Sequence, residues 1–236
     1  MKRFLVFKIK NLVANSAAWF MPFLFCNFLI LVSSSVFSQE EKSEKTWIIA
    51  DLLNEKEDVT VLGDPTIIDS PYGNAVQFDG VDDGFLLKEM PLKDLSEFTI
   101  EMIIRFDRGG TEEQRYFHTG TVKQDRVLME MRSGENTWYL DGMFESKTKW
   151  VVLMDSVLTH PLDEWYHIAF TVENGKQVTF VNGKKELEGT VEFSPIVDGS
   201  TSIGVRQNKI SWFKGAIYCI RITGKVLRPC EFLNFE

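Results

Sequence analysis

The feature that most constrains the fold of this chain is a regular alternation of side chains between Phe98 and Phe106. Every second residue of the stretch is apolar: Phe98, Ile100, Met102, Ile104 and Phe106. A period of two places these side chains on one face of a β-strand. The stretch therefore predicts a strand with one face against a hydrophobic core. A second alternation predicts another such strand: Tyr166, Ile168, Phe170 and Val172.

Short apolar runs separated by turn residues make up most of the remaining chain. Asn182-Gly183 is the clearest of the turns, because both residues accept the positive φ angles of a type I′ hairpin. Helical periodicity is nearly absent after the first 38 residues. The sequence therefore predicts an antiparallel β-sandwich. We assign residues 47–236 to one domain and the charged residues 39–46 to a flexible leader.

The first 38 residues have the pattern of a secretory signal peptide. A basic start is followed by an apolar segment from Ala17 to Val32 and by small residues up to Ser38. The alternative is an uncleaved membrane anchor, although Pro22 and Asn27 interrupt the apolar segment. Cleavage after Ser38 predicts a protein that is secreted, periplasmic or held at the cell surface.

The charge of the chain restricts its partners. Loss of the signal peptide would remove four basic residues and no acidic ones, which takes the formal net charge from −8 to −12. An acidic surface disfavours nucleic acid and anionic membranes as partners. It is compatible with neutral sugars, with cations or with a basic protein.

Four phrases of the sequence resemble those of the laminin G-like or concanavalin A-like jelly-roll domains. They are Gly73 to Asp83, Phe98 to Met102, Trp165 to Ala169 with Val181 to Lys184, and a closing set of Ile203-Gly204, Phe213 to Ile217 and Arg221-Ile222. The resemblance implies an all-β, two-sheet antiparallel jelly-roll sandwich over residues 47–236, preceded by the signal peptide. Domains of this fold serve as lectins, adhesion modules and enzymes, so the resemblance implies a fold and not one function.

Asp79, Asp82 and Asp83 are candidate ligands of a metal ion. Calcium prefers six to eight oxygen ligands, and clustered carboxylates on a loop can supply several. The alternative is a plain turn, because an aspartate side chain readily accepts hydrogen bonds from nearby backbone. The resemblance implies further acidic residues in the closing strand, but Tyr218 and Cys219 stand there. Structural calcium and a plain turn both stay open at this stage.

Aromatic residues are the candidates for a sugar site, because the apolar C–H face of a pyranose packs on an aromatic ring. The candidate ligand-binding residues are Trp212, Asn208, Gln207, Trp138 and Trp150. We rank Trp212 first, because it precedes the last strand in a segment with loop composition. The alternative for any one of these tryptophans is a place in the core. Trp165 is assigned to the core through the resemblance.

Two cysteines remain after the signal peptide, Cys219 and Cys230. An oxidising compartment permits one disulfide between them. The alternative is a pair of buried free thiols, which pack as small hydrophobic groups. We predict the disulfide.

No catalytic constellation stands out in the sequence. Glycosidases of similar fold place carboxylates at alternate positions of one strand, and Glu186-x-Glu188 is the nearest echo of that pattern. We therefore predict a monomeric, non-catalytic module that binds a carbohydrate or a glycosylated protein, with no nucleic acid partner and no membrane span after signal cleavage. The alternatives are a protein adhesion module and a divergent glycoside-active enzyme.

Overall fold

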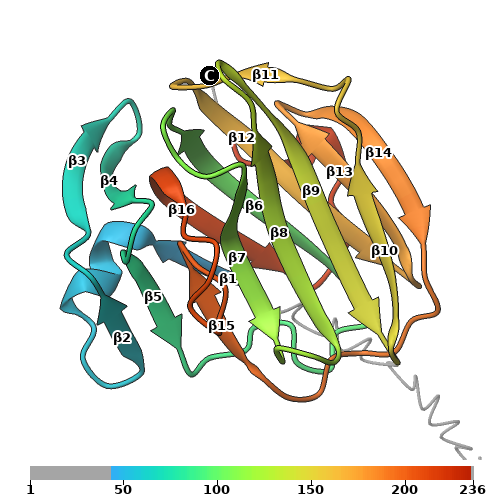
Figure 1. Cartoon of the computed structure of the whole chain (residues 1–236). Helices are drawn as coiled ribbons and strands as arrows, with labels where there is room; N and C mark the ends of the chain where they lie inside the picture. Colours follow the sequence, from blue (N-terminus) through green and yellow to red (C-terminus); the bar gives the residue numbers. More distant parts are fainter. Residues whose placement is uncertain (1–43, 235–236) are drawn as a thin grey trace, which may run out of the picture. The chain divides into compact units, whose positions relative to one another are not determined.

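The computed structural model describes residues 44–234 and shows two antiparallel β-sheets packed face to face (Figure 1). Sheet A has the order β14-β13-β12-β6-β16-β4-β3, and β1 also pairs with β16. Its strands are β1 (Glu44–Ile48), β3 (Thr66–Ser70), β4 (Gly73–Asp79), β6 (Glu97–Phe106), β12 (Trp165–Glu173), β13 (Lys176–Val181), β14 (Lys184–Thr190) and β16 (Lys214–Thr223).

Sheet B has the order β10-β9-β8-β7-β15-β5-β2, and β11 also pairs with β9. Its strands are β2 (Val59–Leu62), β5 (Gly84–Leu87), β7 (Glu113–Gly120), β8 (Arg126–Ser133), β9 (Thr137–Ser146), β10 (Lys149–Met154), β11 (His160–Pro161) and β15 (Ser200–Ile203). Two short 3-10 helices complete the described part, η1 (Ile49–Asn54) and η2 (Pro229–Glu231). The predicted two-sheet antiparallel sandwich is confirmed.

The core lies between the inner faces of the two sheets. β6 runs between β12 and β16, and its five alternating apolar side chains are at most 1% exposed, as predicted. Phe106 of β6 packs against rings of sheet B, with its centroid 4.0 Å from Trp138 and 5.4 Å from Tyr116. Burial of these large rings is a main source of stability for the sandwich.

The hairpin between β13 and β14 confirms the turn prediction. Asn182 and Gly183 have φ angles of 49° and 72°, and the flanking Val181 and Lys184 are paired. Asn182 also accepts a hydrogen bond from the His167 backbone N–H through Oδ1, at 3.0 Å. The turn residues therefore set the register of this edge of sheet A.

The start of the domain differs from the prediction. β1 begins at Glu44 and pairs with β16, so the last residues of the predicted leader belong to sheet A. Residues 1–43 lie outside the described part, and with them the predicted signal peptide and the rest of the leader. Within residues 44–234, no helix is long and apolar enough to cross a membrane.

The end of the chain is held by a buried carboxylate on the outer face of sheet A. Glu101 of β6 is fully buried, and its oxygens accept hydrogen bonds from Leu233 N at 2.7 Å and Arg221 Nε at 2.7 Å. His167 Nε2 lies 2.9 Å from Glu101 Oε1, and the His167 ring packs on Phe232. The charge of Glu101 is thus fully matched, which a buried carboxylate requires.

The predicted Cys219–Cys230 disulfide is absent, because both cysteines are free thiols. Cys219 is buried in β16, where its neighbours across the sheet are Ile48 and Ile103. Cys230 is exposed on η2. Cys219 therefore matches the alternative of a buried free thiol, whereas Cys230 lies at the surface and differs from both predictions.

We expect these thiols to differ in reactivity. Burial raises the pKa of Cys219 to about 11, so little thiolate forms there at neutral pH. A maleimide reagent applied to the native protein should label the peptide that carries Cys230 and leave Cys219 unlabelled until the protein is unfolded. Mass spectrometry of a non-reduced digest makes the measurement. A peptide cross-linked through both cysteines would contradict the free-thiol structure.

Candidate functional site

The outer face of sheet B carries a dense set of charged side chains, which we call the charged face. Its members alternate with core residues along three neighbouring strands: Glu113 and Arg115 on β7, Arg126, Glu130 and Arg132 on β8, and Asp141 and Glu145 on β9. These strands cross the front of the view in Figure 1. Strand register places opposite charges next to each other, since Arg115 pairs with Glu130 and Arg126 with Glu145.

The arginines of the charged face bridge its carboxylates. Arg132 lies 2.7 Å from Asp141 Oδ2 and 2.6 Å from Glu113 Oε2. Arg115 contacts both Glu113 and Glu130. Although they lie on the outer face, Glu130 and Asp141 are each at most 5% exposed. Interactions among these groups are therefore much less screened by water than those of an ordinary surface ion pair.

Glu130 and Asp141 form a carboxylate pair across two strands. They are directly opposed in the register, so their Cβ atoms are about 5 Å apart. Burial raises the pKa of Glu130 to about 7, Arg115 opposes the rise, and Asp141 adds to it. A search for carboxylates at alternate positions of one strand misses this pair, because only strand pairing brings the two residues together.

Arg126 stands at the other end of the charged face, near two loops. It forms an ion pair with Glu145 at 2.8 Å and also donates to the Val122 carbonyl. Arg206, from the segment after β15, donates to the same carbonyl at 3.1 Å. His118 is fully buried beside them, and burial lowers its pKa to about 3, helped by the arginine charges. His118 is therefore neutral at physiological pH.

Trp150 is the most exposed of the predicted sugar-binding tryptophans. It lies on the edge strand β10 and is 61% exposed. Together with Thr148, Lys149, Thr190, Val191 and Glu192 it lines an open cleft of about 470 Å³. Lys149 Nζ and Glu192 Oε2 form an ion pair of 2.5 Å in this cleft. The cleft thus combines an aromatic surface with hydroxyl, ammonium and carboxylate groups.

Trp138 does not fit its predicted role in ligand binding. It is fully buried, it stacks on Phe106, and its indole N–H donates to the Pro161 carbonyl at 3.1 Å. It is a core residue, since alternation along β9 turns it inward. Trp165, assigned to the core through the resemblance, is instead half-buried: it contacts the Tyr72 ring, and the Arg105 guanidinium lies over it at 5.5 Å.

The remaining predicted residues lie in the segment between β15 and β16. The Gln207 amide donates to the Ser200 carbonyl at 2.6 Å and to the Gly120 carbonyl at 3.1 Å, so its N–H groups hold loops together. Asn208 is exposed and Trp212 is half-buried. The structure brings Trp212 close to the charged face, because the adjacent Ser211 contacts Arg115 through its side chain and its backbone carbonyl.

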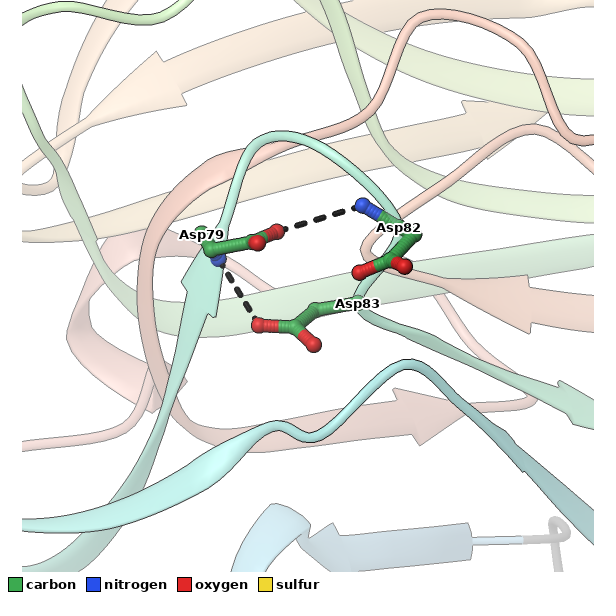
Figure 2. Close-up of side chains that lie close together, drawn as sticks. All are labelled: Asp79, Asp82 and Asp83. Atoms are coloured by element: carbon green, nitrogen blue, oxygen red, sulfur yellow. Dashed lines mark hydrogen bonds between the residues drawn. The ribbon is translucent and has the colours of Figure 1, made fainter.

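Asp79, Asp82 and Asp83 converge at the corner between β4 and β5 (Figure 2). One oxygen from each lies within 4.8 Å of the others, and such a cluster could hold a metal ion. The same carboxylates serve the turn. Asp79 accepts from Val81 N at 2.7 Å and Asp82 N at 3.2 Å, and Asp83 accepts from Asp79 N at 3.0 Å.

Asp79 and Asp83 of this acidic corner differ in their burial and in the direction of their pKa shifts. Asp83 is buried and also accepts from Asp64 N at 2.7 Å, which ties the turn before β3 to the corner; burial raises its pKa. The pKa of Asp79 is lowered, because its backbone hydrogen bonds and Lys214 outweigh its partial burial. Lys214 of β16 is the residue paired with Asp79, whereas Tyr218 packs on Tyr72 further along.

The pKa of Glu130 predicts a distinct pH dependence of stability. Its folded value of about 7 exceeds the ordinary 4.5, so folded protein keeps a proton that unfolded protein loses between these values. This group's contribution to stability is therefore complete below about pH 4.5 and falls as the pH rises through 7. The melting temperature of wild type should fall relative to that of Glu130→Gln as the pH rises from about 4.5 to about 7. Parallel curves of melting temperature against pH would contradict the raised pKa of Glu130. His118 is present in both proteins, so its own titration does not affect the difference between them.

Asp83 should matter more to stability than Asp82. Asp83→Ala leaves two backbone N–H groups without an acceptor, so we expect the free energy of unfolding to fall by about 1–3 kcal/mol. Asp82→Ala, at an exposed position of the same turn, is the matched control and should change it by less than about 0.5 kcal/mol. Both are measured by urea unfolding in EDTA. A calcium-induced rise in melting temperature that Asp82→Ala removes would assign the corner to the metal instead.

Comparisons with known proteins place this architecture. Domain 4 of AbnA, a GH43 extracellular arabinanase from Geobacillus stearothermophilus solved in complex with arabinotriose, is 19% identical, has a TM-score of 0.58, and aligns over 73% of this chain and 85% of that one. The binding domain of botulinum neurotoxin serotype D is 12% identical, with a TM-score of 0.56, over 74% of this chain and 45% of that one. At these identities the likeness shows the fold alone.

Sequence comparison gives the family. No curated protein matches the chain. A family profile does match over residues 79–231, which is more than half of the chain and includes the acidic corner, the charged face and Trp150. The chain belongs to the concanavalin A-like lectin/glucanases superfamily.

Proposed function

We propose that this protein is a non-catalytic module that binds carbohydrate in the cleft beside Trp150. The observation that carries the proposal is the 61% exposure of a tryptophan in a cleft lined with polar groups. An exposed indole is costly in water, and the C–H face of a sugar ring covers it well. Thr148, Thr190 and the Lys149–Glu192 pair supply donors and acceptors for hydroxyl groups around that ring.

The size of the cleft supports a short glycan as its ligand. Its volume of about 470 Å³ is within the range of small-molecule sites, about 300–1,000 Å³. The cleft is open, so a longer chain could continue past Trp150 along the edge of sheet B. The arabinanase domain was solved with arabinotriose, and cell entry of botulinum neurotoxin type C depends on interaction with two ganglioside molecules, which supports a carbohydrate ligand for this chain too.

Catalysis is not part of the proposal, although the superfamily includes glucanases. Glu130 and Asp141 are the best-placed carboxylates, but both are nearly buried and each is bound by an arginine. A general acid or a nucleophile needs free access to the substrate. A reducing-sugar assay on every glycan that binds addresses this point, and release of sugar ends that Glu130→Gln abolishes would overturn it.

A protein partner is the second candidate, because β10 is an edge strand with an apolar outer face. Val152 and Met154 accompany Trp150 there and are 43% and 48% exposed. Exposed apolar rows of this kind often mark interaction surfaces. The botulinum neurotoxin DC binding domain, of which this chain matches 45%, was solved in complex with rat synaptotagmin II, which supports a protein as the second candidate ligand. Three further predictions are compatible with either ligand. They are secretion or surface display, a monomeric state, and structural calcium at Asp79, Asp82 and Asp83.

Trp150→Ala tests the sugar site. We expect it to abolish retention on every glycan that wild type binds in an array, because it removes the stacking surface. The melting temperature should change little, since the side chain is mostly exposed. Val152→Ala, on the same face of β10, is the matched control: it should preserve glycan binding and weaken only a protein partner.

Two outcomes would contradict the Trp150 site. One is a wild-type protein that binds no glycan while it captures a protein partner in a manner that Val152→Ala weakens, which would support the second candidate. The other is glycan binding that persists in Trp150→Ala but is lost in Trp212→Ala. That result would place the sugar site in the segment between β15 and β16, as the sequence predicts. The melting temperature of Trp212→Ala shows whether a loss there reflects a lost contact or a damaged core.

A further inference from the structure

Three hydrogen-bond donors near the Val122 carbonyl have no partner among the described residues. They are Arg126 Nε, Arg206 Nε and Thr121 Oγ1, and all three are buried. Arg126 and Arg206 each donate another nitrogen to the Val122 carbonyl, so two guanidinium groups meet at one point. Buried donors are nearly always satisfied, and an unpaired one costs about 1–3 kcal/mol. Together they mark a point where the described residues supply too few acceptors.

The charge at this point is positive. Within residues 44–234, Arg206 has no carboxylate partner, and the only one of Arg126 is Glu145. Burial lowers the pKa of Arg206, and the charges of Arg115 and Arg126 lower it further, whereas Glu130 and Glu113 act in the opposite direction. Lys123 and Lys209 are exposed on the same two loops. Asp125, the residue before Arg126, brings one carboxylate to these loops and accepts a hydrogen bond from the Lys147 backbone N–H at 2.7 Å.

We propose that Arg126, Arg206 and Thr121 form a binding site for an oxyanion, the sulfate or carboxylate group of an acidic glycan. A planar guanidinium presents several N–H donors in the geometry that such groups accept, and the threonine hydroxyl adds a neutral donor. The part of the proposal that names a glycan rests on the proposed function. The oxyanion site itself rests on the unpaired donors and on the two guanidinium groups that meet at the Val122 carbonyl.

The position of the site relative to Trp150 fits one extended ligand. Trp150, Glu145 and Arg126 are paired in register across β10, β9 and β8, so they share one rung of the outer face of sheet B. Neighbouring strands are about 4.8 Å apart, which puts Arg126 about 10 Å from the strand of Trp150. A sugar stacked on Trp150 could therefore carry its anionic substituent, or that of the next unit, to the two arginines.

Titration with inorganic sulfate at constant ionic strength tests the oxyanion site without any glycan. Isothermal calorimetry on wild type should show saturable binding. Arg206→Gln should weaken it at least about tenfold, since charge-assisted hydrogen bonds are lost. Thr121→Val removes only the hydroxyl and should weaken it about threefold. Arg228→Gln removes an equal charge from an exposed position on the N-terminal side of η2 and should leave it unchanged. Circular dichroism shows whether each variant is folded.

A second arm uses one oligosaccharide in sulfated and desulfated form. We expect wild type to prefer the sulfated form and Arg206→Gln to lose that preference while it still binds the desulfated form. Absence of saturable sulfate binding, or equal binding by Arg206→Gln, would overturn the oxyanion site. Sulfate binding with no binding of either oligosaccharide would overturn the glycan source and the proposed function, and would leave a site for a free inorganic anion.

Discussion

The contact between Phe106 and Trp138 is the interaction on which the sandwich depends. Their ring centroids are 4.0 Å apart, and they come from opposite sheets. Tyr116 and Phe213 pack around Phe106, so aromatic rings from both sheets fill the centre of the core. Side chains alternate between the two faces of each strand. Where one residue packs inward among these rings, its neighbours in the chain therefore point outward. The charged face is the outward consequence of that packing on β7, β8 and β9.

The outer faces of the two sheets handle charge in different ways. On sheet A, Glu101 is satisfied by Arg221, His167 and the backbone of Leu233, so the cluster closes on itself and secures the chain end. On sheet B, the Glu113–Arg132–Asp141 part is similarly matched, whereas the Arg126–Arg206 end has donors to spare. A buried ion pair stabilises only when its charges are compensated. The Arg126–Arg206 end, with its unpaired donors, is therefore where we propose that a ligand binds.

Much of the fold could be predicted from local patterns. The alternation from Phe98 to Phe106 and the Asn182-Gly183 turn depend on nearest neighbours in the chain, and both appear as expected. The candidate site could be predicted only in part. Trp138 and Trp150 look alike in sequence, yet one is fully buried and the other 61% exposed, because Trp138 faces the core from β9 whereas Trp150 faces outward from the edge strand β10. The disulfide prediction was wrong for a similar reason. The spacing of two cysteines in the sequence does not reveal that Cys219 is buried in a central strand.

The sequence by itself determined the class of this protein: short alternating strands, tight polar turns and the phrases of a concanavalin A-like jelly roll. The strands follow from the period of side chains along the chain, the turns from the residue types that accept positive φ angles, and the jelly roll from a resemblance of sequence phrases. Only the tertiary structure decided which charges meet. Arg126, Glu145 and Trp150 come from separate strands, and Arg206 reaches Arg126 from beyond β15. Their meeting depends on the pairing register and on loops that cross the sheet, which are long-range properties that no local pattern encodes.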